Sequence, residues 1–186
     1  LGFKANAGVK IHGGWSRLLP QKSLTINFRD KYGTNHIDYM LFNDKPIQSF
    51  GTFMLRNGGS GARDRTKFRD GMMNTLVAEQ MDVDRQSYQP SVVFINGEYW
   101  GILNIRERMN THYMESNYNL DPNDVNILGQ TYGRNYVNNI NGNMNDYNEM
   151  INFSQTNDLT LPAVFDEIAS QVDINELINY EISQIY

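Results

Sequence analysis

Cysteine is absent from this chain of 186 residues. Its absence excludes disulfide bonds, thiolate metal sites and a cysteine nucleophile. Long apolar runs are absent as well, since no stretch approaches the roughly 18 apolar residues that a membrane-spanning helix needs. Basic residues do not dominate, because 16 Lys and Arg stand against 21 Asp and Glu, for a net charge of −5. We therefore expect no membrane span and no nucleic-acid partner, which would need a clustered basic face.

Histidine is scarce, which limits metal and hydrolytic chemistry. The three histidines, His12, His36 and His112, are far apart in the sequence and have no His-x-x-x-His spacing. We predict no metal centre from them. A Gly-x-Ser-x-Gly elbow is also missing, so a Ser/His/Asp hydrolase has no support.

The residues that are present suit a globular domain. Hydrophobic residues make up 40% of the chain and aromatic residues 12%, enough for a sizeable core in one domain or a domain and a half. The chain opens on strand-like sequence without a cleavable signal pattern at Leu1, as expected for a piece of a longer protein.

Up to about Asn110 the chain consists of short segments of alternating apolar residues, separated by Gly, Asn and Asp. This pattern predicts antiparallel strands. Asn96-Gly97 is the strongest turn signal, because a type I′ turn needs positive φ at both central residues. We therefore expect residues 91–95 to pair with 98–106.

One helix interrupts these strands. Apolar residues recur with a helical period over residues 66–81, and Thr66 or Asp64 is the expected cap. The period predicts an apolar stripe that faces the sheet. After Asn110 the periodicity is helical and predicts helices at 111–119, 146–156, 163–171 and from 174 to the last residue. The segment 129–145, rich in Asn and Gly, is expected to be an exposed, mobile loop.

A glycine turn followed by a lysine is the most informative local motif. Gly13 and Gly14 precede Lys22, which stands at the start of an alternating strand. Glycines bring backbone N–H groups close to an anion, and a lysine on the next strand supplies a compact positive charge. The spacing matches neither the Walker pattern nor the dinucleotide fingerprint. A plain hairpin turn and a solvated strand end remain the alternative interpretation.

Further blocks follow this motif in a recognisable order: Gly8–Arg17, Gln21–Leu24, Leu55–Asn57, Phe68–Asp70, Asn96–Gly101 and Asn104–Arg108. Together they resemble the spore coat protein H (CotH) kinase family, especially its secreted bacterial members, over roughly residues 7–128. The resemblance implies an α+β fold of the atypical protein-kinase type. We expect a kinase-like small lobe at 1–109, an antiparallel sheet with one helix and a β-hairpin at 91–106, followed by helices of a partial large lobe at 110–186.

The resemblance also implies an activity and a location. Members of the family transfer phosphate from ATP to Ser or Thr of surface proteins, with Mg or Mn as the metal. ATP and a Ser/Thr-containing surface protein are thus the expected partners. A secreted or cell-surface position in a bacterium is the expected location.

Lys22 matches the family's conserved lysine, so the implied role is contact with the nucleotide phosphates. The family's glycine-containing loop matches Gly13, Gly14, Ser16 and Arg17. His12 stands where the family more often has arginine, which removes a permanent positive charge.

A kinase-type lysine also needs a carboxylate to orient it. Asp70, near the start of the predicted helix, and Glu79, near its end, are candidates for pairing with Lys22. Asp70 has an alternative role in the favourable interaction of an acid with the helix dipole. Glu107 follows a family position beside the presumed hinge, and we favour it over Glu79. Solvated charges at the end of an edge strand are the alternative for Glu107.

The family's catalytic motifs, Asn-x-Asp-Trp and a later Trp-Asp-x-Asp, do not occur in these residues. We therefore assign no catalytic and no metal-binding residue, and we expect the 186-residue chain to be inactive by itself. The alternative function is a non-catalytic binding or adhesion module of a secreted bacterial protein. Trp15, Tyr99 and Trp100 suggest an adenine or sugar platform, or else ordinary packing.

Overall fold

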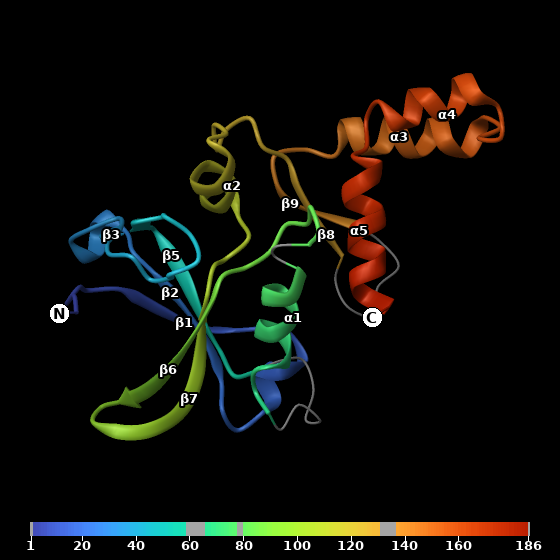
Figure 1. Ribbon diagram of the computed structural model, residues 1–186. Helices are drawn as coiled ribbons and strands as arrows, with labels where there is room; N and C mark the ends of the chain where they lie inside the picture. The colour runs from blue at the N-terminus through green and yellow to red at the C-terminus, as the bar shows by residue number, and fades with distance from the viewer. Residues whose placement is uncertain (1, 59–65, 78–79, 131–136, 186) are drawn as a thin grey trace. The chain divides into compact units, whose positions relative to one another are not determined.

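The computed structural model describes residues 2–58, 66–77, 80–130 and 137–185 (Figure 1). Helices and antiparallel strands are mixed along the chain, which confirms the predicted α+β class. The chain divides into two compact units, one of Leu1–Leu76 with Arg85–Pro122 and one of Val77–Asp84 with Asn123–Tyr186. The second helix, α2, therefore belongs to the unit that contains the large sheet. The predicted boundary at 109/110 stays a prediction.

The first unit is built on a five-stranded antiparallel sheet in the order β1-β2-β5-β7-β6. Its strands are β1 (Gly8–His12), β2 (Ser23–Asn27), β5 (Thr52–Arg56), β6 (Tyr88–Ile95) and β7 (Glu98–Arg106). A 3₁₀ turn, η1 (Trp15–Leu18), follows the glycine turn between β1 and β2.

The β6–β7 hairpin has the turn that the sequence predicts. Asn96 has φ 53° and Gly97 has φ 85°, the positive values that a type I′ turn requires. The expected pairing of 91–95 with 98–106 is confirmed, and the ladder extends back to Tyr88 with an irregularity between Val93 and Phe94. Figure 1 shows the two strands as a long, twisted ribbon.

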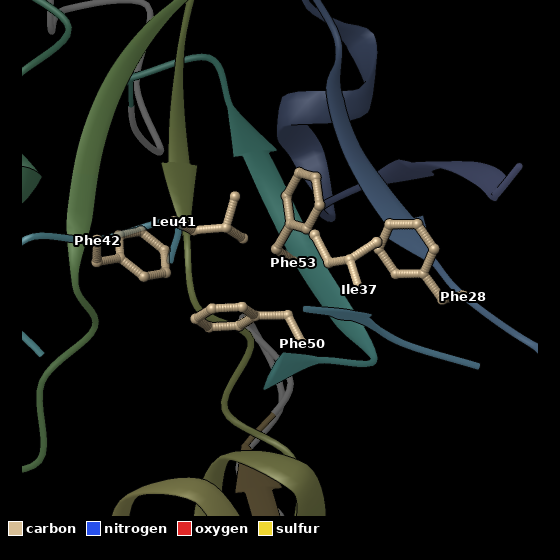
Figure 2. Close-up of a cluster of buried hydrophobic side chains, with 6 residues drawn as sticks. All are labelled: Phe28, Ile37, Leu41, Phe42, Phe50 and Phe53. Atoms are coloured by element: carbon tan, nitrogen blue, oxygen red, sulfur yellow. The ribbon is translucent and has the colours of Figure 1, made fainter. Parts of the chain in front are cut away.

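The hydrophobic core of this unit lies against one face of the sheet. The segment between β2 and β5 holds η2 (Asp30–Tyr32) and the short pair β3 (Ile37–Asp38) and β4 (Ser49–Phe50). Its apolar side chains form the buried cluster with the sheet, shown in Figure 2: Phe28, Ile37, Leu41, Phe42, Phe50 and Phe53. Ile26, Leu55 and Ile105 of the sheet pack against this cluster.

The helix after β5, α1 (Arg69–Val77), differs from the prediction in the face that it buries. It is shorter than 66–81, and Asp64 and Glu79 lie outside the described residues. The predicted apolar stripe does not face the sheet, because Phe68, Met72 and Leu76 are 46%, 40% and 59% exposed.

Gly71 is the buried residue of α1. A Cβ at this position would overlap the ring of Tyr88 on β6. The helix backbone therefore approaches the sheet closely at Gly71. A small residue determines this contact, which a search for apolar periodicity does not find.

The helix after β7, α2 (Thr111–Tyr118), confirms the prediction at 111–119. The side chain of its cap, Asn110, accepts a hydrogen bond from the backbone N–H of Tyr113. Asn119 ends the helix in the left-handed conformation.

The second unit contains a strand pair and three helices. The strands are β8 (Ile127–Gln130) and β9 (Val137–Asn141), and the helices are α3 (Asn145–Thr156), α4 (Pro162–Ala169) and α5 (Ile174–Ile185). The helices confirm the predicted ones. The loop expected at 129–145 is wrong as stated, because β9 and the end of β8 lie in it. Asparagine side chains form hydrogen bonds in this segment; for example, Asn141 Nδ2 donates to the carbonyl of Val125.

No helix among the described residues is long and apolar enough to cross a membrane.

Candidate functional site

The five-stranded sheet has one apolar and one polar face. Side chains alternate along each strand, so every second residue belongs to the same face. The apolar face carries Ile26, Phe53 and Leu55 and packs on the core. The polar face carries residues that a purely structural sheet would seldom bury. Its polar members with less than one twentieth of their surface exposed are Ser23, Thr25, Asn104 and Arg106.

A row of polar side chains crosses this face next to the glycine turn. His12 is the register partner of Ser23, and Arg56 is the partner of Asn104. The Ser23 hydroxyl and Asn57 link β2 to β5, because the hydroxyl donates to Asn57 Oδ1 at 2.9 Å and accepts from the Asn57 backbone N–H at 3.0 Å. The row consists of His12, Ser23, Arg56 and Asn104, one residue from each of four strands. It lies at the end of the sheet where β1 leads into the glycine turn.

Gly13 has a conformation that favours glycine. Its φ is +107°, and a Cβ there would overlap the hydroxyl of Ser16. Gly14 has a negative φ of −95° and no atom near the place of a Cβ. The two glycines therefore differ: the fold requires the first, whereas the second has open space where a side chain would begin.

Lys22 lies just before β2 and is tied to the glycine turn. Its Nζ donates a 2.7 Å hydrogen bond to the carbonyl of Arg17 in η1. The structure thus brings together Gly13, Ser16, Arg17 and Lys22, as the sequence predicts for a common loop. Contact of these residues with phosphate stays a prediction.

Asp70 pairs with arginines rather than with Lys22. Arg106 Nη1 donates to Asp70 Oδ2 at 2.7 Å, and Arg56 Nη1 is 3.7 Å from the same oxygen. Only 1% of the Arg106 side chain is exposed, and its Nε and Nη2 have no hydrogen-bond partner among the described residues. Burial lowers the pKa of Arg106, and the neighbouring Asp70 carboxylate opposes this effect. Arginine nevertheless stays charged.

Glu107, the other expected partner of Lys22, instead binds Lys45. Lys45 Nζ is 2.7 Å from Glu107 Oε2, with 13% and 4% of the two side chains exposed. The backbone N–H of Ser87 donates to the same oxygen at 2.8 Å, and Asn117 Nδ2 donates to Oε1 at 3.2 Å. The carboxylate is fully engaged within the first unit, so the structure makes Glu107 part of a structural ion pair between the β3–β4 segment and the end of β7, with Asn117 of α2 as a further partner.

Positive charge surrounds His12 on the polar face. The pKa of His12 lies below its ordinary value of 6.5, because burial disfavours the imidazolium and because Arg56, Arg108 and Lys10 repel it. Its Nδ1 is 3.0 Å from the hydroxyl of Thr25.

The two aromatic candidates whose side chains are described, Tyr99 and Trp100, are not buried. Tyr99 is 63% and Trp100 39% exposed, and Tyr99 contacts Phe94 across the hairpin. The side chain of Trp15 lies outside the described part of the structure. Among the described residues, no group of three or more His, Cys, Asp or Glu side chains is placed to hold a metal ion.

A cleft of about 750 Å³ lies between the β3–β4 segment and α2. His36, His112 and Glu115 contribute to its lining. None of the seven residues predicted from the sequence lines this cleft. The predicted site residues therefore lie outside this cleft, in the glycine turn, just before β2, in α1 and after β7.

The cations that pair with the predicted carboxylates Asp70 and Glu107 are Arg56, Arg106 and Lys45. The sequence pattern predicts none of these three as a site residue. Arg56 lies in the block Leu55–Asn57 and Arg106 in the block Asn104–Arg108, so the resemblance contained both. The strand alternation places both on one face once the register is known. Lys45 has no such signal, because its segment shows no periodic pattern.

Comparison with known proteins agrees with this architecture. The sequence profile of the family described as "CotH kinase protein" matches residues 9–186. No curated protein matches the chain. The matched region covers nearly the whole chain and includes the glycine turn, the sheet, α1 and the helices that follow. The chain therefore belongs to the CotH kinase protein family.

Proposed function

We propose that this chain is part of an ATP-dependent protein kinase of the CotH type, which transfers phosphate to Ser or Thr of secreted or surface proteins. The observation that carries the proposal is the polar sheet face beside the Gly13–Gly14 turn, with cations from several elements around it. Family membership supports phosphoryl transfer in general, and the polar face supports a polyanionic ligand.

The chemistry of this face suits the phosphates of ATP. Phosphoryl transfer depends on positioning and on neutralising the charge of the phosphate oxygens. Lys22 and the glycine turn are joined by a hydrogen bond, and Arg56 lies on β5 at the adjoining end of the sheet. These groups bind and orient an anion. His12, kept neutral by its surroundings, adds no charge at neutral pH.

Magnesium or manganese belongs to this proposal as the companion of ATP, where it neutralises charge on the β- and γ-phosphates. The described residues bring no three candidate ligands together. We therefore assign no residue of this chain to the metal and derive no step through it. Because Asn-x-Asp-Trp and Trp-Asp-x-Asp do not occur in the sequence, we also expect no phosphoryl transfer by these 186 residues alone.

A binding or adhesion module is the second candidate function. The exposed aromatic residues of the β6–β7 hairpin, Phe94 and Tyr99, favour it because exposed aromatics are frequent contacts for proteins and glycans. The two functions differ in ligand. A kinase binds ATP with its metal, whereas an adhesion module with the same fold does not.

Calorimetric titration with ATP and magnesium tests the proposal. The unchanged chain is expected to bind, and Lys22→Met is expected to weaken binding about tenfold or more, as the loss of a charged hydrogen bond predicts. Lys31→Met, which removes an exposed lysine stacked on Tyr32, is the matched control and keeps the original affinity. Absence of ATP binding by the unchanged chain overturns the nucleotide assignment.

The location is tested separately. We propose a secreted or cell-surface protein of a bacterium, in keeping with the exported members that the sequence resembles. Cell fractionation of the full-length protein is expected to place it outside the cytoplasm. Recovery of the full-length protein only from the cytoplasm contradicts this part of the proposal.

A further inference from the structure

The order of elements around Arg56 is that of the cation and carboxylate pair of protein kinases. There, a lysine on the third strand of the small-lobe sheet pairs with a carboxylate on the following helix. In this chain β5 is the third strand of the five-stranded sheet along the sequence, and α1 is the next helix. Arg56 is the last residue of β5, and Asp70 lies in the first turn of α1.

The two arginines that meet Asp70 have different access to solvent. Arg106 is 1% exposed and donates a 2.7 Å hydrogen bond to Asp70 Oδ2. Arg56 is 29% exposed, lies 3.7 Å from the same oxygen and donates no hydrogen bond within the described residues. Arg106 therefore serves as the buried anchor. Arg56 is the accessible cation, with donors available to a ligand.

The burial of Arg106 is costly for stability. Two of its nitrogens, Nε and Nη2, have no partner among the described residues. Unsatisfied buried donors of a charged group destabilise a fold, and such groups are characteristic of functional sites. An apolar residue beside Met54 and Tyr88, its register partners on β5 and β6, would pack without this cost. The presence of an arginine at position 106 is therefore better explained by its hydrogen bond to the Asp70 carboxylate than by packing.

The charges on this face also favour a polyanion. Lys10, Arg56 and Arg106 share this face, and Asp70 is the carboxylate that the described residues pair with the two arginines, so positive charge is in excess in this part of the structure. A guanidinium presents a planar fork of N–H groups that matches phosphate oxygens. Lys22, by contrast, already donates to the Arg17 carbonyl.

We propose that Arg56 contacts the nucleotide phosphates, that Asp70 positions the Arg56 guanidinium, and that Arg106 holds Asp70 in place. This inference rests on the proposed function, because it names the residues of the same ATP site. Arg56 is the ligand-contacting residue. Asp70 and Arg106 are positioning residues that act through it.

The test compares ligands that differ in phosphate number. Affinities of the 186-residue chain for ATP with magnesium and for adenosine are measured by calorimetry for the unchanged chain, Arg56→Gln, Arg56→Lys and Asp70→Asn. Arg56→Gln is expected to lose about tenfold or more in ATP affinity and to keep its adenosine affinity. Arg56→Lys is expected to recover part of the loss. Asp70→Asn is expected to weaken ATP but not adenosine, a pattern that general misfolding does not produce.

Arg29→Gln is the matched control, because Arg29 is an exposed arginine just after β2. Its ATP affinity is expected to be unchanged. A second readout, the NMR titration of His12, keeps the test independent of stability: bound phosphate beside Arg56 raises the pKa of His12, since it offsets the cations that lower it.

The outcomes separate this inference from the proposed function. If the unchanged chain binds no ATP, the proposed function fails, and this inference fails with it. If the chain binds ATP and Arg56→Gln binds it equally well, this inference alone is overturned. If Arg56→Gln loses affinity for ATP and adenosine alike, the selective phosphate role is overturned. If Arg56→Gln loses affinity and Lys22→Met does not, the inference stands, and the role of Lys22 is withdrawn.

Discussion

Lys45 Nζ lies 2.7 Å from Glu107 Oε2, and this pair joins the segment before β4 to the end of β7. Lys45 also donates to the carbonyl of Arg85 and to Asn117 Oδ1, and its ammonium lies 4.9 Å from the ring centre of Tyr113. The largely buried ammonium of Lys45 therefore links the β3–β4 segment to Arg85, Glu107 and α2 of the first unit.

Removing one partner of this pair is expected to destabilise the fold strongly. Glu107→Ala leaves the Lys45 ammonium buried without its carboxylate, which costs about 3–5 kcal/mol in the free energy of unfolding. Chemical denaturation monitored by circular dichroism measures this change. Glu115→Ala is the control, because Glu115 is 53% exposed in its contact with His112 and is expected to change stability by about 1 kcal/mol or less. Equal effects of the two substitutions contradict the structural role of Glu107.

The two glycines of the turn are expected to respond differently to alanine. Gly13→Ala forces a side chain into φ +107° and against Ser16, a strain of about 1–3 kcal/mol. Gly14→Ala meets no neighbouring atom and has a negative φ, so it is expected to cost less stability than Gly13→Ala. Thermal unfolding of both variants checks this. A Gly14→Ala variant as unstable as Gly13→Ala shows that the turn has another conformation.

His12 is expected to make stability depend on pH. Its pKa in the folded state lies below the ordinary value of 6.5, so the unfolded chain binds the proton more tightly. The stability that neutral His12 contributes is thus fully present above pH 6.5 and is lost as pH falls through the lowered pKa.

NMR titration of His12 measures this pKa directly. Its midpoint is expected below 6.5, and Arg56→Gln is expected to move it upward, because Arg56 is the first of the cations that lower it. A His12→Asn variant is expected to lose less of its free energy of unfolding than the unchanged chain when the pH is lowered, because this proton-binding group is absent. A midpoint that does not respond to Arg56→Gln contradicts the proximity of the two side chains.

The close approach of α1 to the sheet gives a further prediction. Gly71→Ala places a methyl group against the ring of Tyr88 and is expected to cost about 1–3 kcal/mol of stability, despite the higher helix propensity of alanine. Met72→Ala on the exposed side of the same helix is the control and is expected to have little effect. Denaturant unfolding compares the two. A Gly71→Ala variant that is as stable as Met72→Ala means that α1 docks elsewhere.

The strands and helices were largely predictable because local chemistry specifies them. Asn96-Gly97 encodes its turn through positive φ, and alternation over residues 98–106 encodes the strand. The strand at Val137–Asn141 was missed because asparagines occupy it and hide the alternation. The side chains of Asn139 and Asn141 donate to backbone carbonyls, which composition alone does not distinguish from a loop.

The pairing of charges was less predictable, because it depends on contacts between residues distant in sequence. The sequence identifies Asp70 and Glu107 as candidate carboxylates but predicts Lys22 as their partner, whereas the structure pairs them with Arg106 and Lys45. The partner of Asp70 follows from the sheet register, which brings Arg106 beside β5, and the partner of Glu107 comes from a segment without periodicity. Side-chain pairing across strands therefore needs the three-dimensional structure.

The two-faced sheet also has a consequence for folding. If β5 slipped by a single residue against its neighbours, its alternation would be reversed, and Arg56 would enter the hydrophobic core while Phe53 turned toward the polar side. Such a misaligned sheet would bury charge without partners, so it is strongly disfavoured. The charged residues of the polar face thereby also disfavour incorrectly paired intermediates while the chain folds.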